Sequence, residues 1–104
     1  MRTVEVGDPW AALADPTRRA VLARVAECPR SVEQIAATLP VSRPAVSQHL
    51  RVLSEANLVV ARRVGRCRIY RLQPEGLRGP RAELERFWSD ALENFKRIAE
   101  EAPT

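Results

Sequence analysis

Residues 39–53 concentrate hydrogen-bonding side chains on one face of a segment that the spacing of its apolar residues predicts to be helical. Val46, Leu50 and Leu53 lie on one helical stripe, which can face a core. Arginine and glutamine carry paired hydrogen-bonding groups that match base edges in the major groove of DNA, and serine can bond a base or a phosphate. A solvated helix face has a similar composition, so the flanking sequence decides between the two interpretations. The polar face comprises Arg43, Ser47, Gln48 and Arg51, and the candidate DNA-binding residues of this segment also include Ser42 and Pro44.

Two helices joined by a tight turn are predicted around this segment. Ser31 and Gln34 have the spacing of a capping box, in which each side chain bonds an amide that the helix leaves unpaired. A short helix therefore begins at Ser31 and ends before a proline, and the next begins at Ser42 or Arg43. Residues 31–57 thus have the outline of a helix-turn-helix, in which the second helix enters a DNA groove and the first braces it.

Residues 58–72 change character and predict a β-hairpin. Strand-forming residues dominate this run, and Val64-Gly65-Arg66 supplies a turn between its two halves. Ile69 and Tyr70 are adjacent and point to opposite faces, and the sequence leaves open which of them is buried. No acidic residue in this run neutralises its arginines, and such a hairpin resembles the wing of a winged helix. The wing arginines are Arg62, Arg63, Arg66, Arg68 and Arg71.

Caps and apolar spacing predict the remaining elements. Residues 9–14 form a short helical piece, and Asp15 caps the helix that follows. A further helix starts after the hairpin, is interrupted at Gly79-Pro80, and continues over residues 81–99 with a regular apolar stripe. The predicted fold is a single mainly α domain that covers the chain (residues 1–104), a winged helix-turn-helix with the order α-α-α-α-β-β-α.

The positive charge is confined to the predicted helix-turn-helix and hairpin. Residues 30–72 carry eight arginines against two glutamates, a net charge of +6, while residues 1–29 are neutral and residues 73–104 carry −2. This asymmetry predicts a polyanionic partner, because phosphate contacts supply most of the sequence-independent affinity of DNA-binding proteins. Double-stranded DNA is therefore the expected partner.

Much of the apolar side-chain area of this 104-residue chain must find a partner. A domain of this size buries only about 60–70% of the surface that its unfolded chain exposes, and three of its five aromatic residues lie on the last predicted helix. We expect a homodimer built on residues 81–99, with residues 9–14 packed beside that helix. The alternative is that the stripe covers the core of its own subunit. The predicted dimer interface comprises Trp10, Leu13, Leu84, Phe87, Trp88, Ala91, Leu92 and Phe95.

Hydropathy and cysteine usage predict a cytoplasmic protein. The sequence shows no secretory signal and no apolar stretch of about 18 residues that could span a membrane. Cys28 and Cys67 form an isolated pair, for which no structural disulfide is expected in a reducing compartment. A redox role stays open, since Arg66 and Arg68 would favour the Cys67 thiolate. The favoured alternative is apolar packing for Cys28 and an incidental exposed thiol for Cys67.

No set of residues predicts an enzyme or a metal site. Asp15, Glu33, Asp90 and Glu93 form no pair in an identifiable cleft, and the sequence has no nucleophile motif or phosphate-binding glycine loop. His49 lies at the edge of the apolar stripe, where a hydrogen-bonded structural histidine is favoured over a ligand or a base. Two distant cysteines and one histidine are too few for a transition-metal site. We therefore expect neither a metal nor another cofactor.

Three segments carry a joint pattern: ALADPTRR at residues 12–19, LPVSRPAVSQHL at 39–50 and RIYRL at 68–72. Together they resemble the arsenical-resistance repressor (ArsR/SmtB) family of bacterial winged-helix repressors, over residues 9–99. The resemblance implies a dimeric transcription regulator, often an autorepressor, that binds a palindromic operator. By position, it implies base contacts from Arg43, Pro44, Ser47 and Gln48, and phosphate contacts from Arg51 and the wing arginines.

Metal-sensing members of that family carry a Cys-x-Cys motif before the recognition helix, or paired histidine and acidic ligands on the last helix. Residues 31–37 contain neither cysteine nor histidine, and the last predicted helix has no histidine, so we expect no metal sensing here. Two other functions stay open: a ligand- or redox-responsive switch of the same fold, and a protein-interaction module that does not bind DNA. The density of wing arginines argues against the second of these, because an interaction module need not keep them.

Overall fold

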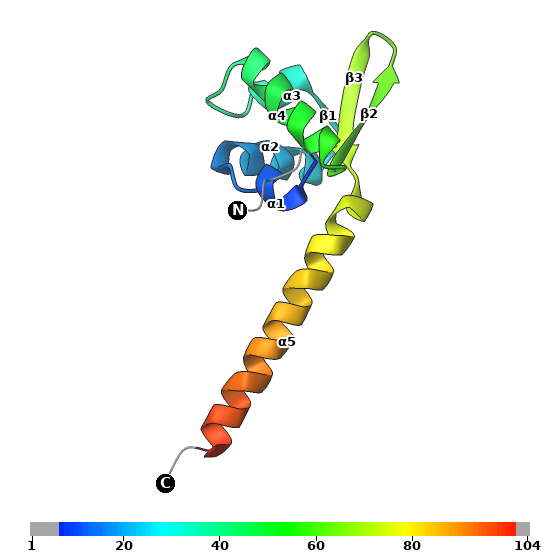
Figure 1. Ribbon diagram of the computed structural model, residues 1–104. Coiled ribbons are helices and arrows are strands. Elements are labelled where there is room, and N and C mark those ends of the chain that lie inside the picture. Colours follow the sequence, from blue (N-terminus) through cyan, green and yellow to red (C-terminus); the bar gives the residue numbers. More distant parts are fainter. Residues whose placement is uncertain (1–6, 102–104) are drawn as a thin grey trace.

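A computed structural model describes residues 7–101 of the chain, and Figure 1 shows the order of its elements. The result confirms the predicted class: a mainly helical fold with a β-hairpin wing. One short strand, β1, comes in addition to the predicted order, and the 3₁₀ helix η1 stands where a helix was predicted to start after the hairpin. The elements are α1 (Pro9–Ala12), α2 (Pro16–Glu27), β1 (Arg30–Ser31), α3 (Val32–Ala36), α4 (Arg43–Glu55), β2 (Val59–Val64), β3 (Cys67–Leu72), η1 (Pro74–Leu77) and α5 (Arg78–Glu101).

Side-chain caps fix where the helices of the helix-turn-helix begin. The Ser31 hydroxyl accepts the Gln34 amide at 3.2 Å, and the Gln34 side chain accepts the Ser31 amide at 2.9 Å, which is the predicted capping box. Ser42 caps α4 by accepting the Ala45 amide at 3.3 Å. Asp15 caps α2 in the same way. The predicted starts of these three helices are therefore confirmed.

The sheet has three strands, whereas the sequence predicted only the hairpin. Strand β3 lies between β1 and β2, with Arg30 opposite Tyr70 and Ser31 opposite Ile69. Strand β1 has only two residues, too few to show the alternation by which strands are recognised in sequence. Tyr70 is the buried member of the adjacent pair, and Ile69 is half-buried.

The core lies where α4 packs against the helices and strands on either side of it. Val46, Leu50 and Leu53 are fully buried, as their spacing predicts. Because these three side chains anchor α4 by one face, the opposite face of the helix stays at the surface. The core also contains Ala12, Val21, Val25, Ile35, Ala56, Leu58, Val59 and Tyr70.

The last helix is continuous through Gly79-Pro80, so the predicted interruption is wrong. Helix α5 begins at Arg78, which places Pro80 in its first turn. The first amides of a helix have no partner within it, so a proline there removes no hydrogen bond.

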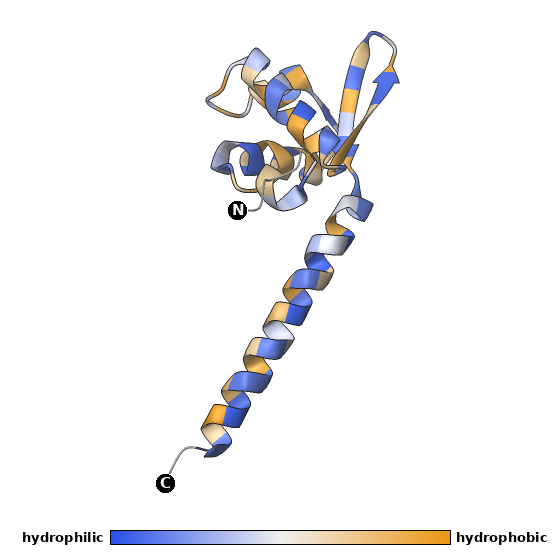
Figure 2. Cartoon of the chain, in the orientation of Figure 1, coloured by the Kyte–Doolittle hydropathy of each residue, from blue (hydrophilic) through white to orange (hydrophobic). Residues whose placement is uncertain are grey.

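Helix α5 extends away from the rest of the chain as a single rod (Figure 1). The radius of gyration is 18.3 Å, against about 13 Å for a compact chain of this length. No residue of α5 is buried, although apolar side chains recur along its whole length (Figure 2). The alternative that this stripe covers the core of its own subunit is therefore wrong. Within residues 7–101, no helix combines the length and the hydropathy needed to cross a bilayer.

Gly76 lies in η1, close to the backbone of Asn57 just after α4. We expect Gly76→Ala to destabilise the fold. A Cβ atom at this position would fall inside the van der Waals radius of the Asn57 carbonyl, so backbone must move. The expected loss is about 1–3 kcal/mol of unfolding free energy, measured as a lower midpoint of thermal unfolding at one protein concentration. Gly79→Ala is the matched control, because a Cβ there meets nothing within 4 Å. Equal midpoints for the two variants would contradict this close approach.

Candidate nucleic-acid interface

The predicted reading face of α4 is exposed as a whole. Ser47 and Gln48 lie on the surface of the helix between the buried Val46 and Leu50. Arg43 and Pro44 form its first turn, and the capping Ser42 precedes them. All six predicted side chains of this face, Ser42, Arg43, Pro44, Ser47, Gln48 and Arg51, are accessible to a ligand from solvent.

Both arginines of this face are held by carboxylates of the same chain. Arg43 Nη2 donates to Glu33 Oε1 of α3 at 2.9 Å, and Arg51 Nε lies 3.7 Å from Glu55 Oε1 one helical turn away. The sequence predicted no partner for Glu33, which was considered only as a candidate catalytic carboxylate. The contact joins residues ten apart on two helices, so helical periodicity does not predict it. The one signal for this ion pair in the sequence was that residues 30–72 contain only two acids.

The hairpin presents arginines that have no such partners. Arg63 and Arg68 lie directly opposite each other on β2 and β3, where like charges destabilise a sheet. All five wing arginines are exposed, and within residues 7–101 none forms an ion pair with a carboxylate. A bound anion would relieve this repulsion, so the hairpin is suited to phosphate.

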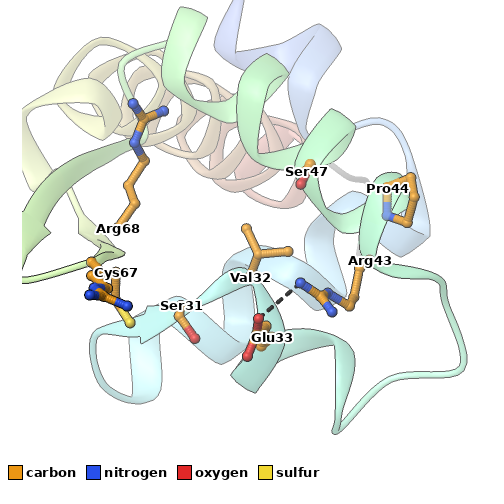
Figure 3. A pocket seen from close by; sticks show the side chains of 9 residues that line it. Ser31, Val32, Glu33, Arg43, Pro44, Ser47, Cys67 and Arg68 are labelled. Carbon is orange, nitrogen blue, oxygen red and sulfur yellow. Dashed lines mark hydrogen bonds and ion pairs between the residues drawn. The ribbon is translucent and has the colours of Figure 1, made fainter.

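A hollow of about 610 Å³ lies between the wing and the start of α4. Figure 3 shows the wing residues on one side of it and Arg43 with Pro44 on the other. The structure thus brings Arg43, Pro44 and Ser47 together with Arg66 and Arg68, but leaves Gln48, Arg51, Arg62 and Arg63 outside the hollow. The lining residues are Ser31, Val32, Glu33, Arg43, Pro44, Ser47, Arg66, Cys67 and Arg68.

The two cysteines are free and exposed, so the expected apolar packing of Cys28 is wrong. Arg30 of β1 and Tyr70 of β3 lie opposite each other. Cys67 is three residues from Tyr70 toward one end of the sheet, and Cys28 is two residues from Arg30 toward the other end. At about 3.3 Å per residue this separates them by about 16 Å along the strands, more than twice the span of a disulfide. A bond between the two cysteines of one chain therefore requires a large rearrangement.

His49 sits behind the reading face, half-buried at the edge of the core as predicted. Its Nδ1 atom is buried and finds no hydrogen-bond partner within the described part of the chain, so this nitrogen does not supply the hydrogen bond expected of a structural histidine. Asp15 lies near His49, and its carboxylate accepts hydrogen bonds from the backbone amides of Arg18 and Thr17. These bonds, with the nearby His49 and Arg18 side chains, hold the pKa of Asp15 below its usual range. Residues 7–101 contain no group of three metal-binding side chains.

The predicted dimer residues on α5 share one exposed stripe. Leu84, Trp88 and Phe95 are 47%, 56% and 70% exposed, and only Ala91 of the predicted set on this helix is half-buried. Trp10 lies beside the start of α5, since its Nε1 donates to Glu83 Oε2 at 2.7 Å. Leu13 differs from the rest, because it packs against the core of its own subunit.

An exposed polar helix, braced by a second helix and flanked by an arginine-rich hairpin, defines a winged helix-turn-helix protein that binds DNA. Residues 13–62 match the model of a helix-turn-helix domain family. Over 89 residues the chain is 52% identical to the HTH-type transcriptional regulator Rv2034 of Mycobacterium tuberculosis, covering 86% of this chain and 83% of that protein.

Solved structures agree with this sequence relationship. The ArsR-like transcriptional regulator from Rhodococcus sp. RHA1 is 36% identical with a TM-score of 0.72, over 89% of this chain and 91% of that one. The homodimeric winged helix-turn-helix DNA-binding domain Mb0332 from Mycobacterium bovis is 30% identical with a TM-score of 0.62, over 82% of this chain and 79% of that one. The chain belongs to the ArsR/SmtB family of transcriptional regulators.

Proposed function

We propose that the protein is a homodimeric repressor that binds a palindromic operator in the bacterial cytoplasm through two copies of α4. The observation that carries this proposal is the apolar stripe of α5, exposed along the length of the helix. Two related proteins support it by their names: the Mb0332 domain is described as homodimeric, and SmtB of Mycobacterium tuberculosis, 41% identical over 66 residues, as a repressor. The proposal involves no catalytic step.

The stripe has the spacing of a seam between helices. Leu84, Trp88, Ala91, Phe95 and Ile98 alternate steps of four and three residues, which keeps them on one line of the helix. Large apolar side chains that stay this exposed in a monomer mark an interaction surface. A second copy of α5 supplies a matching surface, since a twofold interface joins the same patch on both subunits.

The DNA contacts divide between the helix and the wing. We assign base recognition to the exposed first turns of α4, with Ser47 and Gln48 facing the major groove and Arg43 beside them. We assign the phosphate backbone to the wing, where Arg66 and Arg68 lack carboxylate partners within residues 7–101. In the dimer, two such surfaces would lie about one DNA turn apart, roughly 34 Å.

Titration of a fluorescent duplex of mixed sequence tests the proposal in its simplest form. We expect binding at low salt, with chains bound in multiples of two per duplex at saturation, because each dimer engages DNA as a unit. The logarithm of the association constant should fall linearly with the logarithm of salt concentration, with a slope of about −0.9 for each phosphate neutralised. A protein that fails to bind any duplex in dilute buffer would refute the proposed function.

A further inference from the structure

Each acidic residue near the reading face forms an ion pair with one arginine of α4. Glu33 and Glu55 are the only two acids in residues 30–72. Glu33 contacts Arg43 and Glu55 contacts Arg51, the only two arginines of that helix. The wing arginines, by contrast, form no ion pair within residues 7–101. The chain therefore pairs both arginines of α4 with carboxylates and leaves the wing arginines without such partners within residues 7–101.

The fold has little need of these two ion pairs. The side chains of Arg43 and Glu33 are 67% and 70% exposed, and those of Arg51 and Glu55 are 73% and 42% exposed. Ion pairs in such contact with water contribute little to stability. Each carboxylate also places a negative charge beside an arginine of the proposed reading face, where stability does not require it. A role in discrimination between sequences accounts for both features.

The Glu33 contact leaves most of the Arg43 guanidinium free. Glu33 Oε1 accepts from Nη2 alone, at 2.9 Å, and Figure 3 shows this contact at the edge of the hollow. A guanidinium has five N–H donors, so Arg43 can still donate to a base edge while it is paired. Rotation toward a phosphate exchanges one anionic oxygen for another and leaves Glu33 unpaired beside a polyanion. The gain from an extra phosphate contact is then largely cancelled.

We infer that Glu33 is a specificity-determining residue, which restrains Arg43 from binding the backbone of DNA that lacks the operator sequence. Glu55 restrains Arg51 less, because its ion pair is longer, 3.7 Å against 2.9 Å, and Arg51 is itself expected to contact phosphate. This inference rests on the proposed function, since it concerns how one DNA sequence is preferred over others.

Glu33→Gln tests the inference by removing the charge while keeping the size of the side chain. We expect affinity for a scrambled duplex to rise about tenfold, because each subunit gains one phosphate contact. The salt slope of the dimer should steepen by about 1.8, about 0.9 for each subunit. Affinity for an operator duplex of the same length, chosen by selection from random sequences, should change less than twofold. The ratio of the two affinities therefore falls by nearly the same factor, and Glu55→Gln lowers it less.

Glu85→Gln is the matched control for the change in charge. Glu85 forms an exposed ion pair with Arg81 on α5 at 3.0 Å, with side chains 67% and 81% exposed, away from the reading surface. We expect this variant to change binding to both duplexes by the same factor. Circular dichroism of each variant verifies that the helical content is unchanged.

Two results would overturn the inference. An equal rise for the operator and the scrambled duplex in Glu33→Gln would mean that the carboxylate acts only through net charge. A loss on the operator with no change on the scrambled duplex would mean that Glu33 merely supports the site. If the wild-type protein binds neither duplex, the proposed function itself fails, and this result is distinct from both.

Discussion

Replacing Trp88 and Phe95 with aspartate is expected to convert the protein to a monomer and to lower its operator affinity at least a hundredfold. Both side chains lie on the exposed stripe of α5, at 56% and 70% exposure, and a charge there cannot be buried between two helices without a large desolvation penalty. Two linked reading surfaces gain about 10²–10⁴ in affinity over one alone. Sedimentation velocity gives the mass, and duplex titration gives the affinity.

The control for this prediction places the same charges on the other side of the helix. Ala82→Asp with Ser89→Asp replaces two neutral, exposed residues outside the predicted interface of α5, so the net charge changes by the same amount. This variant should remain a dimer and retain its helical content by circular dichroism. A Trp88→Asp, Phe95→Asp protein that still sediments as a dimer at micromolar concentration would show that another surface joins the subunits.

Gln48→Ala and Arg66→Ala are expected to weaken DNA binding in two different ways. Gln48 is exposed on α4, and its loss should cost about 1–3 kcal/mol at each half-site and relax the preference at one base position. Arg66 lines the wing side of the hollow, so its loss should weaken all sequences alike and make the salt slope shallower by about one unit per subunit. Titration of the operator, single-base variants and a scrambled duplex separates these effects.

Arg86→Ala is the control for the loss of an arginine from the wing. Arg86 is exposed on α5 and forms no ion pair within residues 7–101, so its removal should leave the preference for the operator over the scrambled duplex unchanged. If Gln48→Ala and Arg66→Ala lower the affinity for operator and scrambled DNA by the same factor, the assignment of base reading to α4 is wrong.

The helices of the helix-turn-helix could be predicted because the signals that start them are local. The Ser31–Gln34 capping box and the Ser42 cap each involve residues three apart, so their chemistry is legible in the sequence. Burial of Val46 and Leu50 followed from helical spacing in the same way. The exposed reading face is a direct consequence of this burial.

Features that depend on distant contacts were missed. Strand β1 exists because β3 lies beside it, and two residues carry no period of their own. The ion pair of Arg43 with Glu33 arises from the angle between α3 and α4, which the sequence does not specify. The exposure of Cys28 likewise depends on how the chain leaves α2 and enters β1. Helix α5 continues through Pro80 because the helix begins two residues earlier than this proline.

Selection of bound sequences from a pool of random duplexes tests whether two copies of α4, held together by α5, read one DNA site. We expect an enriched inverted repeat whose half-site centres are separated by about one turn, 10–10.5 base pairs. Enrichment of a single asymmetric half-site, or recovery of a pool without any preferred sequence, would contradict it.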